Sequence, residues 1–356
     1  MKLRLLLAVL VQVVLASAAH AAILLFQLTD LGTLGGAESH ATAVNNNGQV
    51  VGKAMTPYGV YRAFAYVNGV MYDLGTLGGD YSAATGINDL AQITGESTLA
   101  NKETRAFSFA NGVMYDLGTL GGNYSTAAGI NNNGLIVGTA ALSSGHDHAF
   151  VFANAVMYDL GTLGGNYSTA AAIDDGNVIV GTSAIATNPL PGEYNQYAFA
   201  FLNGSMQNLS ILGGIFNDPY HPLTIQAVSE GGIAGDYGPD PLGGFGPAGF
   251  AYVGGQLAIF GNSSTSTGSE EGVDAFGDVV GWYNDLGSIT SSEQYASLYQ
   301  DGVLYDLNQA VNLSTSNFSR LLDASATSSR TGYIVGTGMT KSGALHAYLL
   351  TPLPLP

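Results

Sequence analysis

An all-β fold, a seven-bladed β-propeller of four-stranded blades, is predicted by three observations in this sequence. A segment reading D-L-G-T-L-G-G recurs unchanged every 43 residues, at residues 30–36, 73–79, 116–122 and 159–165. Each repeat contains four short apolar stretches separated by turn residues. One further stretch of this kind precedes the first repeat, and the last repeat lacks one.

The second full repeat shows the four expected strands, at residues 83–88, 92–95, 105–110 and 113–117. No window of about 11 residues keeps the i, i+3, i+4 apolar spacing of an amphipathic helix, so strands are predicted. Two alternatives are weaker. A β-solenoid normally has a shorter period, and a ring of six or eight blades would require one degenerate repeat to be miscounted.

The second strand of the repeat sets the number of blades at seven. Its copies are residues 49–52, 92–95, 135–138, 178–181, 232–235, 278–281 and 333–336. The fourth strand also has seven copies, but the first of them, residues 26–31, precedes the first full repeat. We therefore expect the N-terminal strand to complete the last blade, which would close the ring by hydrogen bonds.

Residue size agrees with a ring of blades. The first strands, which would lie nearest the axis, carry a small residue at one aligned position: Ala43, Gly86, Gly129, Ala172, Ala227, Gly272 and Ala324. The third strands carry aromatic residues on one face: Phe64, Tyr66, Phe107, Phe109, Phe150, Phe152, Phe199 and Phe201. Aromatic side chains in this pattern are expected to fill the core between neighbouring blades.

The start of the chain has the pattern of a secretory signal. Lys2 and Arg4 precede an apolar run at residues 5–15, and small residues follow up to Ala21, after which cleavage is expected. An uncleaved anchor is the alternative, but an apolar run of about 11 residues is too short to span a membrane. The sequence thus predicts a signal peptide at residues 1–21 and a single propeller domain at residues 22–356, built of seven repeats of about 43–50 residues. The protein would be secreted, periplasmic or on the cell surface, with no membrane span after cleavage.

Composition excludes several functions. The chain of 356 residues is 46% apolar and 10% charged, which suits a large folded core. Its net charge of -17 would repel phosphate backbones, so nucleic acid is not an expected partner. Cysteine is absent and the six histidines form no ligand motif, so no transition-metal cofactor is predicted.

Calcium is the one cofactor that the sequence leaves open. Residues 131–134 and 174–177 form oxygen-rich loops in an acidic chain. A calcium loop of the EF-hand kind needs a bidentate acid downstream, and residues 135–139 contain none. Ordinary hairpin turns, in which Asn and Gly adopt positive φ, are the favoured interpretation, and no metal-binding residue is predicted.

The order D-L-G-T-L-G-G, then S-x-A-x-x-I-N-x-x-G-x-I-V-G, then H-A-F resembles the bacterial extracellular repeats of the HAF family. The tripeptide is intact at residues 148–150 and nearly so at 346–348, and the resemblance covers residues 26–350, more closely up to residue 181. It implies an exported propeller-type module and supplies no reaction or catalytic residue. The other repeats replace the histidine by Arg62, Arg105, Tyr197, Ala248 and Tyr295, so a catalytic histidine is not expected.

Loop length points to one working face. The connections from second to third strands and from fourth to first strands emerge on the same face, and they lengthen only in the later repeats. Variation confined to one face of a rigid ring is typical of a recognition surface. The ligand-binding residues expected in or beside these loops are Tyr194, Tyr220, His221, Gln226, Tyr237, Trp282 and Tyr283.

The leading hypothesis is therefore a non-catalytic binding or scaffolding propeller that holds a glycan or cell-envelope polymer on the long-loop face of blades four to six. One alternative is a polysaccharide lyase or hydrolase that uses Glu271 and Asp323, two acids aligned in adjacent blades just before the small inner residue. The other repeats carry Thr42, Thr85, Ala128, Ala171 and Gln226 at that position. A purely structural extracellular role is a further alternative, and the sequence does not define the oligomeric state.

Overall fold

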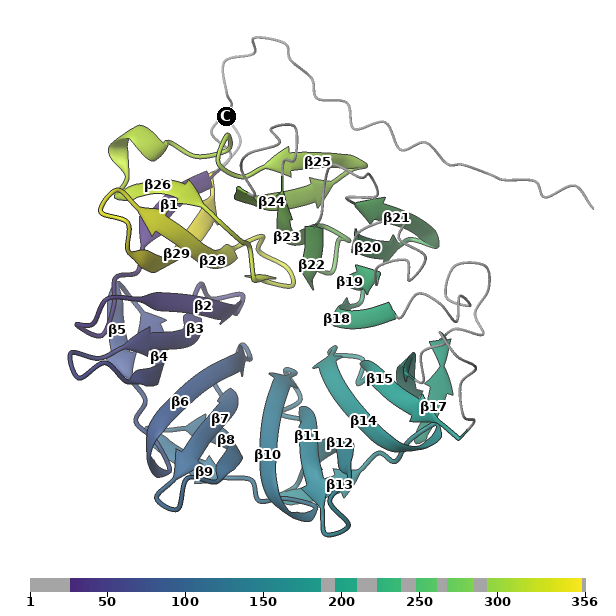
Figure 1. Cartoon of the computed structure of the whole chain (residues 1–356). Coiled ribbons are helices and arrows are strands. Elements are labelled where there is room, and N and C mark those ends of the chain that lie inside the picture. Colours follow the sequence, from purple (N-terminus) through teal and green to yellow (C-terminus); the bar gives the residue numbers. More distant parts are fainter. Residues whose placement is uncertain are drawn as a thin grey trace, which may run out of the picture.

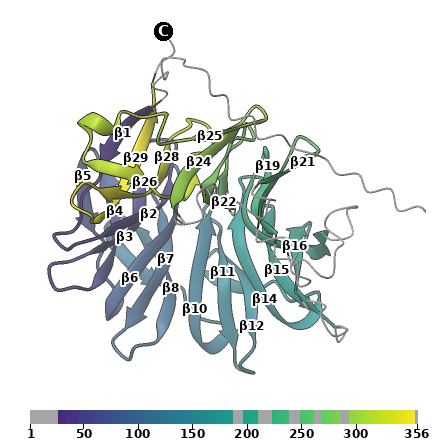
Figure 2. The ribbon, with the colours of Figure 1, turned by 45° about the horizontal axis from the view of Figure 1, so that its top comes forward.

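The computed structural model of the chain describes residues 26–186, 196–209, 223–237, 248–260, 268–284 and 293–353. In this part of the chain, seven antiparallel sheets stand in a ring around a common axis, as Figure 1 shows. The tilted view in Figure 2 shows blades 1 to 4 fanned side by side, so that each sheet faces its neighbours. The prediction of a seven-bladed β-propeller is confirmed.

Blades 1 to 4 follow one another along the chain, and the first strand of each lies nearest the axis (Figure 1). Blade 1 consists of β2 (Ser39–Val44), β3 (Val50–Met55), β4 (Tyr61–Val67) and β5 (Val70–Asp73). Blade 2 consists of β6 (Gly78–Ile87), β7 (Ile93–Leu99), β8 (Thr104–Ala110) and β9 (Val113–Asp116). Blade 3 consists of β10 (Gly121–Ile130), β11 (Ile136–Leu142), β12 (Asp147–Ala153) and β13 (Val156–Asp159). Blade 4 consists of β14 (Gly164–Ile173), β15 (Ile179–Ile185), β16 (Gln196–Leu202) and β17 (Ser205–Asn208).

Blades 5 and 6 repeat this order, and blade 7 combines strands from both ends of the described chain. Blade 5 consists of β18 (Leu223–Ser229), β19 (Gly232–Tyr237), β20 (Ala248–Val253) and β21 (Gln256–Phe260). Blade 6 consists of β22 (Gly268–Val273), β23 (Val279–Asn284), β24 (Gln294–Gln300) and β25 (Val303–Asp306). After the short 3₁₀ helix η2 (Leu313–Thr315), blade 7 consists of β26 (Phe318–Leu321), β27 (Ala326–Thr327), β28 (Ile334–Thr340), β29 (Leu345–Pro352) and β1 (Phe26–Asp30).

The N-terminal strand closes the ring. β1 runs antiparallel to β29, with Phe26 opposite Pro352 and Asp30 opposite Tyr348. This pairing confirms the predicted closure, which leaves no missing strand in blade 7. The predicted signal peptide, residues 1–21, lies outside the described residues, in which no helix has the length and hydropathy of a membrane span.

The hydrophobic core is divided among the seams between blades. Phe64, Phe107, Phe150 and Phe199 are fully buried, as their position on the third strands predicts. The cluster around Phe107 joins residues of blade 1 to residues of blade 2. A buried side chain of this kind contributes about 1.5–3 kcal/mol, so the repeated phenylalanine holds neighbouring blades together.

The D-L-G-T-L-G-G segment is a connector between the outer strand of one blade and the inner strand of the next. In the copy at residues 73–79, Oδ1 of Asp73 accepts the N–H of Gly75 at 2.8 Å, and the hydroxyl of Thr76 donates to the carbonyl of Gly79 at 2.9 Å. Leu74 is buried in the core between the blades. The same Asp and Thr bonds recur in the other three copies. Every polar side chain of the motif therefore serves the backbone of the connector.

A buried serine three residues after the motif locks this connector to the preceding blade. The hydroxyl of Ser82 donates to the carbonyl of Gly75 at 2.6 Å and accepts the N–H of Ala63, on β4, at 2.8 Å. Equivalent pairs of bonds are made by Ser39, Ser125 and Ser168. The repeated motif is thus scaffold, in agreement with the sequence interpretation.

The glycine of the I-V-G segment allows close approach of two strands. At Gly95, a Cβ atom would lie 2.0 Å from the carbonyl oxygen of Ala83 on the inner strand and 2.9 Å from the ring of Phe107. Blades 1, 3 and 4 repeat this contact at Gly52, Gly138 and Gly181. Because the backbone oxygen cannot move away, only glycine fits here.

The inner strands of blades 1 to 6 carry a β-bulge at one shared position, where the pairing with the second strand skips a residue. The skipped residues are Thr42, Thr85, Ala128, Ala171, Gln226 and Glu271. The hydroxyl of Thr42 donates to the carbonyl of Ala84 in blade 2 at 2.7 Å, and that of Thr85 donates to Ala127 in blade 3 at 2.9 Å. These two threonines therefore bridge to the next blade, whereas Gln226 at the same position donates to Asp236 within its own blade.

Blade 7 departs from the alignment that the sequence suggested. An irregular segment between β26 and β27 interrupts its inner strand, and the small residue opposite Val335 is Ala326, not Ala324. The expected equivalence of Asp323 and Glu271 is therefore wrong, because Asp323 lies two residues too early in the register. The irregular segment between β26 and β27 adds two residues to this inner strand, and this insertion moves Asp323 away from the position that Glu271 holds in blade 6.

Candidate functional site

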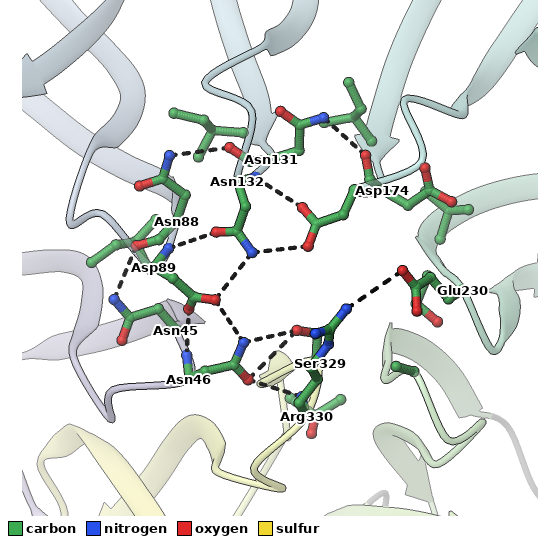
Figure 3. Close-up of a pocket in the computed structure, with 18 of the residues that line it drawn as sticks. Asn45, Asn46, Asn88, Asp89, Asn131, Asn132, Asp174, Glu230, Ser329 and Arg330 are labelled. Carbon is green, nitrogen blue, oxygen red and sulfur yellow. Dashed lines mark hydrogen bonds and ion pairs between the residues drawn. The ribbon is translucent and has the colours of Figure 1, made fainter.

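A central pocket of about 200 Å³ lies on the ring axis, at the face formed by the turns between first and second strands (Figure 3). It is lined by Val44, Asn45, Asn46, Ile87, Asn88, Asp89, Ile130, Asn131, Asn132, Ile173, Asp174, Asp175, Val228, Ser229, Glu230, Val273, Ala275, Thr327, Ser329 and Arg330. All seven blades contribute to this lining. The pocket is on the short-turn face, opposite to the face that the loop lengths favoured.

The first polar residue of each turn holds the turn itself. Oδ1 of Asn88 accepts the N–H groups of Leu90 and Gln92, and its amide donates to the carbonyl of Asn131 in blade 3 at 3.1 Å. In blade 4, Oδ1 of Asp174 accepts the N–H of Val178 at 2.7 Å. In the two loops considered for calcium, Oδ1 of Asn131 accepts the N–H groups of Asn133 and Leu135, and Oδ1 of Asp174 accepts that of Val178, so these oxygens already serve the backbone of their turns. Among the described residues, no group of three or more His, Asp or Glu side chains is arranged to hold a metal ion. Calcium binding stays a prediction.

The second polar residue of each turn forms a chain of hydrogen bonds around the pocket (Figure 3). Asn46 donates its backbone N–H and its amide to the two oxygens of Asp89, at 2.9 and 2.8 Å. Asn132 makes the same pair of bonds to Asp175, both at 2.8 Å. Between these pairs, Asp89 donates its backbone N–H to Oδ1 of Asn132 at 2.8 Å. Amide and carboxylate alternate because each amide donor needs an acceptor in the next blade.

Among the described residues, the bonds between these second side chains continue into blade 7 but not through blades 5 and 6. Those blades are joined through backbone carbonyls instead, because the Ser229 hydroxyl donates to the carbonyl of Asp274 and the N–H of Ala275 donates to the carbonyl of Ser329. Oδ1 of Asn46 accepts the backbone N–H of Arg330 at 2.9 Å. The guanidinium of Arg330 reaches across to Glu230 of blade 5 at 3.5 Å, and both side chains are more than half exposed. Ala275 occupies the matching position in blade 6 and has no polar side chain. We call Asp175, Glu230, Ala275 and Arg330 the open arc of the pocket.

The carboxylates of the open arc and of the rest of the pocket rim differ in how many further hydrogen bonds they can accept. Asp89 accepts three N–H groups, two from Asn46 and one from Asn132, whereas Asp175 accepts one on each oxygen. A carboxylate offers about four acceptor positions, so Asp175 keeps more of them for a ligand. Burial raises the pKa of Asp174, and the nearby charges of Asp175 and Glu230 raise it further. Negative charge thus predominates at this side of the pocket.

Two exposed apolar side chains stand on the turns that form the pocket. Phe276, the residue after Ala275, is 73% exposed, and Leu90, the residue after Asp89, is 72% exposed. Large apolar side chains at such exposure suit contact with a ligand. Phe276 follows Ala275 of the open arc in the same turn, although its side chain is not part of the pocket lining.

The residues expected to bind a ligand are only partly within the described chain. Tyr194, Tyr220 and His221 lie outside the described residues, and Tyr237 is the last residue of β19. Tyr283 stacks on Tyr295 within blade 6, with ring centroids 5.7 Å apart.

The other two expected ligand residues lie near carboxylates, Gln226 near Asp236 on β19 and Trp282 near Glu271 on the inner strand β22. Gln226 donates to Asp236 in its own blade, and the side chain of Trp282 forms a hydrogen bond with Glu271. Trp282 and Asp236 both act on Glu271, which precedes the pocket-lining Val273 by two residues.

The two acids proposed as catalytic are neighbours, but their surroundings differ. Burial raises the pKa of the partly exposed Asp323, whose Oδ1 accepts the hydroxyl of Ser325 at 2.8 Å and the N–H of Thr337 at 2.9 Å. Burial raises the pKa of Glu271 to about 7, and the charges of Asp323 and Asp236 add to this effect. A carboxyl group that titrates near neutral pH can act as an acid, but Asp323 is committed to its protein partners.

Sequence reasoning missed the polar chain around the pocket. Its signal was present, because the residue after the first Asn or Asp of each turn reads Asn46, Asp89, Asn132 and Asp175 at intervals of 43. Considered one repeat at a time, these residues were expected to form turns through positive φ. In the structure, positive φ falls on the later turn residues Gly48, Ala91, Gly134 and Asn177.

Comparison with solved structures identifies the same class of fold. A puromycin-hydrolyzing peptidase of Mycobacterium tuberculosis superposes with a TM-score of 0.54 at 10% identity, over 94% of this chain. The match covers 53% of the peptidase, so this chain spans about half of its length. This similarity supports the propeller fold alone.

Two smaller propellers are more distant. AofleA from Arthrobotrys oligospora has a TM-score of 0.45 at 12% identity, covering 79% of this chain and 87% of its own. SapL1 lectin, solved in complex with alpha methyl fucoside, has a TM-score of 0.43 at 14% identity, covering 78% of this chain and 98% of its own. We draw no argument from scores at this level. No family model and no curated protein sequence matches the chain, and the resemblance to HAF repeats stays a prediction.

Proposed function

We propose that this protein is an exported, non-catalytic binding propeller whose ligand is a glycan or cell-envelope polymer. The observation that carries the proposal is the open arc of the central pocket, where the carboxylates of Asp175 and Glu230 and the guanidinium of Arg330 line one side, and the residue after Ala275 is the exposed Phe276. Sugars present hydroxyl groups that both donate and accept, and they present apolar ring faces. A site of fixed polar groups beside an aromatic surface meets both requirements.

The size of the pocket limits what can enter it. Sites for drug-sized ligands normally enclose about 300–1,000 Å³. The central pocket, at about 200 Å³, suits a single sugar unit. We therefore propose that it holds a terminal or branching unit while the rest of the polymer lies across the short-turn face.

The test is a binding screen of the exported protein against glycans and envelope fractions, with and without calcium. Glu230→Ala combined with Arg330→Ala, and separately Phe276→Ala, are expected to weaken retention at least tenfold. Tyr58→Ala is the matched control, because Tyr58 is 90% exposed on the opposite face. Retention of no ligand by the wild-type protein would refute the proposal. Loss of retention only with Tyr194→Ala or Tyr220→Ala would place the ligand on the long-loop face of blades 4 to 6.

A polysaccharide lyase or hydrolase is the competing hypothesis, and the raised pKa of Glu271 favours it. Replacement of Glu271 and Asp323 by Gln and Asn separates the two functions. In the enzyme case this double variant would abolish turnover of a polymer panel. In the binding case no turnover is seen before or after substitution, and ligand retention stays within about twofold.

A further inference from the structure

The lining of the central pocket has an apolar part and a polar part. The apolar part consists of branched residues at or next to the ends of the inner strands: Val44, Ile87, Ile130, Ile173, Val228 and Val273. These side chains offer a ligand van der Waals contact but no hydrogen bond. Hydrogen bonds to a ligand must therefore come from the polar residues of the turns, which Figure 3 shows around the pocket.

The asparagine amides in the described lining are fully engaged as donors. Asn46 donates its two amide hydrogens to Asp89 and Ser329, at 2.8 and 3.1 Å. Asn132 donates its two to Asp89 and Asp175, at 3.0 and 2.8 Å. Two bonds each are also made by the amides of Asn45, Asn88 and Asn131. Because an amide group carries two N–H donors, these five have none left for a ligand.

The remaining donors of the lining are concentrated on one residue. The hydroxyl of Ser229 already donates to the carbonyl of Asp274. Arg330 supplies the only basic side chain among the described lining residues, and its guanidinium contacts Glu230 at 3.5 Å. A ligand therefore finds few donors in this pocket apart from Arg330.

Acceptors, in contrast, are available on the open arc. The lining contains four carboxyl groups: Asp89, Asp174, Asp175 and Glu230. Asp175 accepts one N–H on each oxygen, both from Asn132, and Glu230 is contacted by Arg330. A carboxylate offers about four acceptor positions, so these two side chains can accept further hydrogen bonds. The pocket thus offers a ligand more acceptors than donors.

The contact between Glu230 and Arg330 can be exchanged for a contact with a ligand. It passes blade 6, where Ala275 stands at the position that carries Asn or Asp in blades 1 to 4. Both charged side chains are more than half exposed, and an exposed ion pair of this kind contributes little to stability. A cationic group of a ligand can therefore take the place of Arg330 at Glu230 without a large loss.

We propose, on the basis of the function proposed above, that the pocket selects a sugar unit that carries a free, protonated amino group. An ammonium group has three N–H donors and no acceptor, which matches a site whose available groups are mainly acceptors. Its bonds to the carboxylates of the open arc are charge-assisted and stronger than those of a neutral hydroxyl. An N-acetylated amine lacks the charge and adds a carbonyl that needs a donor. An acidic sugar is repelled by the carboxylates.

Isothermal titration calorimetry of the exported protein tests this selectivity, with oligomers of glucosamine, N-acetylglucosamine and glucose of equal length and linkage. The titrations are done at about pH 6, where primary amines are protonated, and with EDTA, so that calcium cannot act as a bridge. The glucosamine oligomer is expected to bind at least tenfold more tightly than either of the others.

The outcomes separate this inference from the proposed function. Equal affinities for the glucosamine and glucose oligomers would overturn the inference and leave the glycan function intact. The same holds if the glucosamine oligomer does not bind while another glycan is retained. Failure of all three oligomers to bind, with no retention of any glycan or envelope fraction, would refute the proposed function itself.

Two variants separate recognition in the pocket from general attraction to an acidic protein. Glu230→Gln should lower the affinity for the glucosamine oligomer at least fivefold and leave that for the glucose oligomer within about twofold. Asp301→Asn is the matched control, because it removes the same charge from an exposed turn outside the pocket lining, and it should change neither affinity. Equal losses in the two variants would overturn the proposal.

A third variant and a peptide test the assigned chemistry. Arg330→Gln leaves the carboxylates without a competing cation, so the glucosamine oligomer should bind at least as tightly as to the wild-type protein. A tenfold loss would show that Arg330, and not the carboxylates, holds the ligand. Trilysine carries ammonium groups on a peptide and should bind at least tenfold more weakly than the glucosamine trimer. Equal binding of the two would refute selection of a sugar unit.

Discussion

Replacing Ser82 by alanine would test whether the repeated motif is scaffold. Ser82 is fully buried, and its hydroxyl joins the N–H of Ala63, at 2.8 Å, to the carbonyl of Gly75, at 2.6 Å. Alanine leaves both backbone groups without this partner. The N–H of Ala63 is buried, and an unsatisfied buried group costs about 1–3 kcal/mol, whereas water can reach the half-exposed Gly75. The expected loss in free energy of unfolding is therefore about 2–3 kcal/mol.

Urea unfolding at 25 °C measures this loss from the transition midpoint and slope. Ser168→Ala removes the same two bonds in blade 4, at 2.9 and 2.6 Å, and should match it. Ser205→Ala is the control, because this serine is exposed on β17 and should change stability by less than about 0.5 kcal/mol. If Ser82→Ala and Ser168→Ala both cost less than about 0.5 kcal/mol, the scaffold assignment of the motif is wrong.

Two further perturbations test the close packing of the ring and its closure. Gly95→Ala should cost more than about 3 kcal/mol because its Cβ would lie 2.0 Å from a backbone oxygen, whereas at Gly129 the nearest atom is 3.9 Å away and alanine should be neutral or stabilising by up to about 1 kcal/mol. Equal urea midpoints for the two variants would contradict this account. Removal of residues 1–30 should lower the melting temperature and cause association through the unpaired edge of β29, and a peptide of residues 26–31 should reverse both effects. Unchanged melting and gel filtration would show that β1 is dispensable.

The fold was predictable because most blades repeat the same residue types at the same positions. A buried phenylalanine on the third strands of blades 1 to 5 and a glycine where the second strand closely approaches the first recur through the repeats, and both mark the same places in the structure. The seventh blade was misaligned because the segment around Asp323 interrupts the inner strand. An alignment based on repeat spacing fails where a strand is interrupted. In blade 7 the equivalent residues are those with the same pairing partners on the second strand, not those at the same spacing.

The site was less predictable, because it arises between blades. Asn46 and Asp89 each have the composition of an ordinary turn residue, and only the ring brings one against the other. The contact between Glu230 and Arg330 joins blades 5 and 7, which are not adjacent, and their separation along the chain carries no repeat signal. The contact between Asn46 and Asp89 can be inferred from the sequence because the two residues are 43 positions apart. The contact between Glu230 and Arg330 can be recognised only in the closed ring.

The regular and irregular parts of the ring have different capacities to bind. Where the repeat is intact, from Asn46 to Asn132, amides and carboxylates satisfy one another and leave little for a ligand. Where it decays, Glu230 and Ala275 break the alternation, and the polar groups of the open arc face solvent with fewer partners. The expected site on the long-loop face of blades four to six stays a prediction, and the open arc on the short-turn face is a second candidate where the repeat decays. Substitutions that restore the alternating Asn and Asp residues in the open arc would be expected to stabilise the ring and to weaken ligand binding. The reason is that one hydrogen-bonding group cannot bond to the neighbouring turn and to a ligand at the same time.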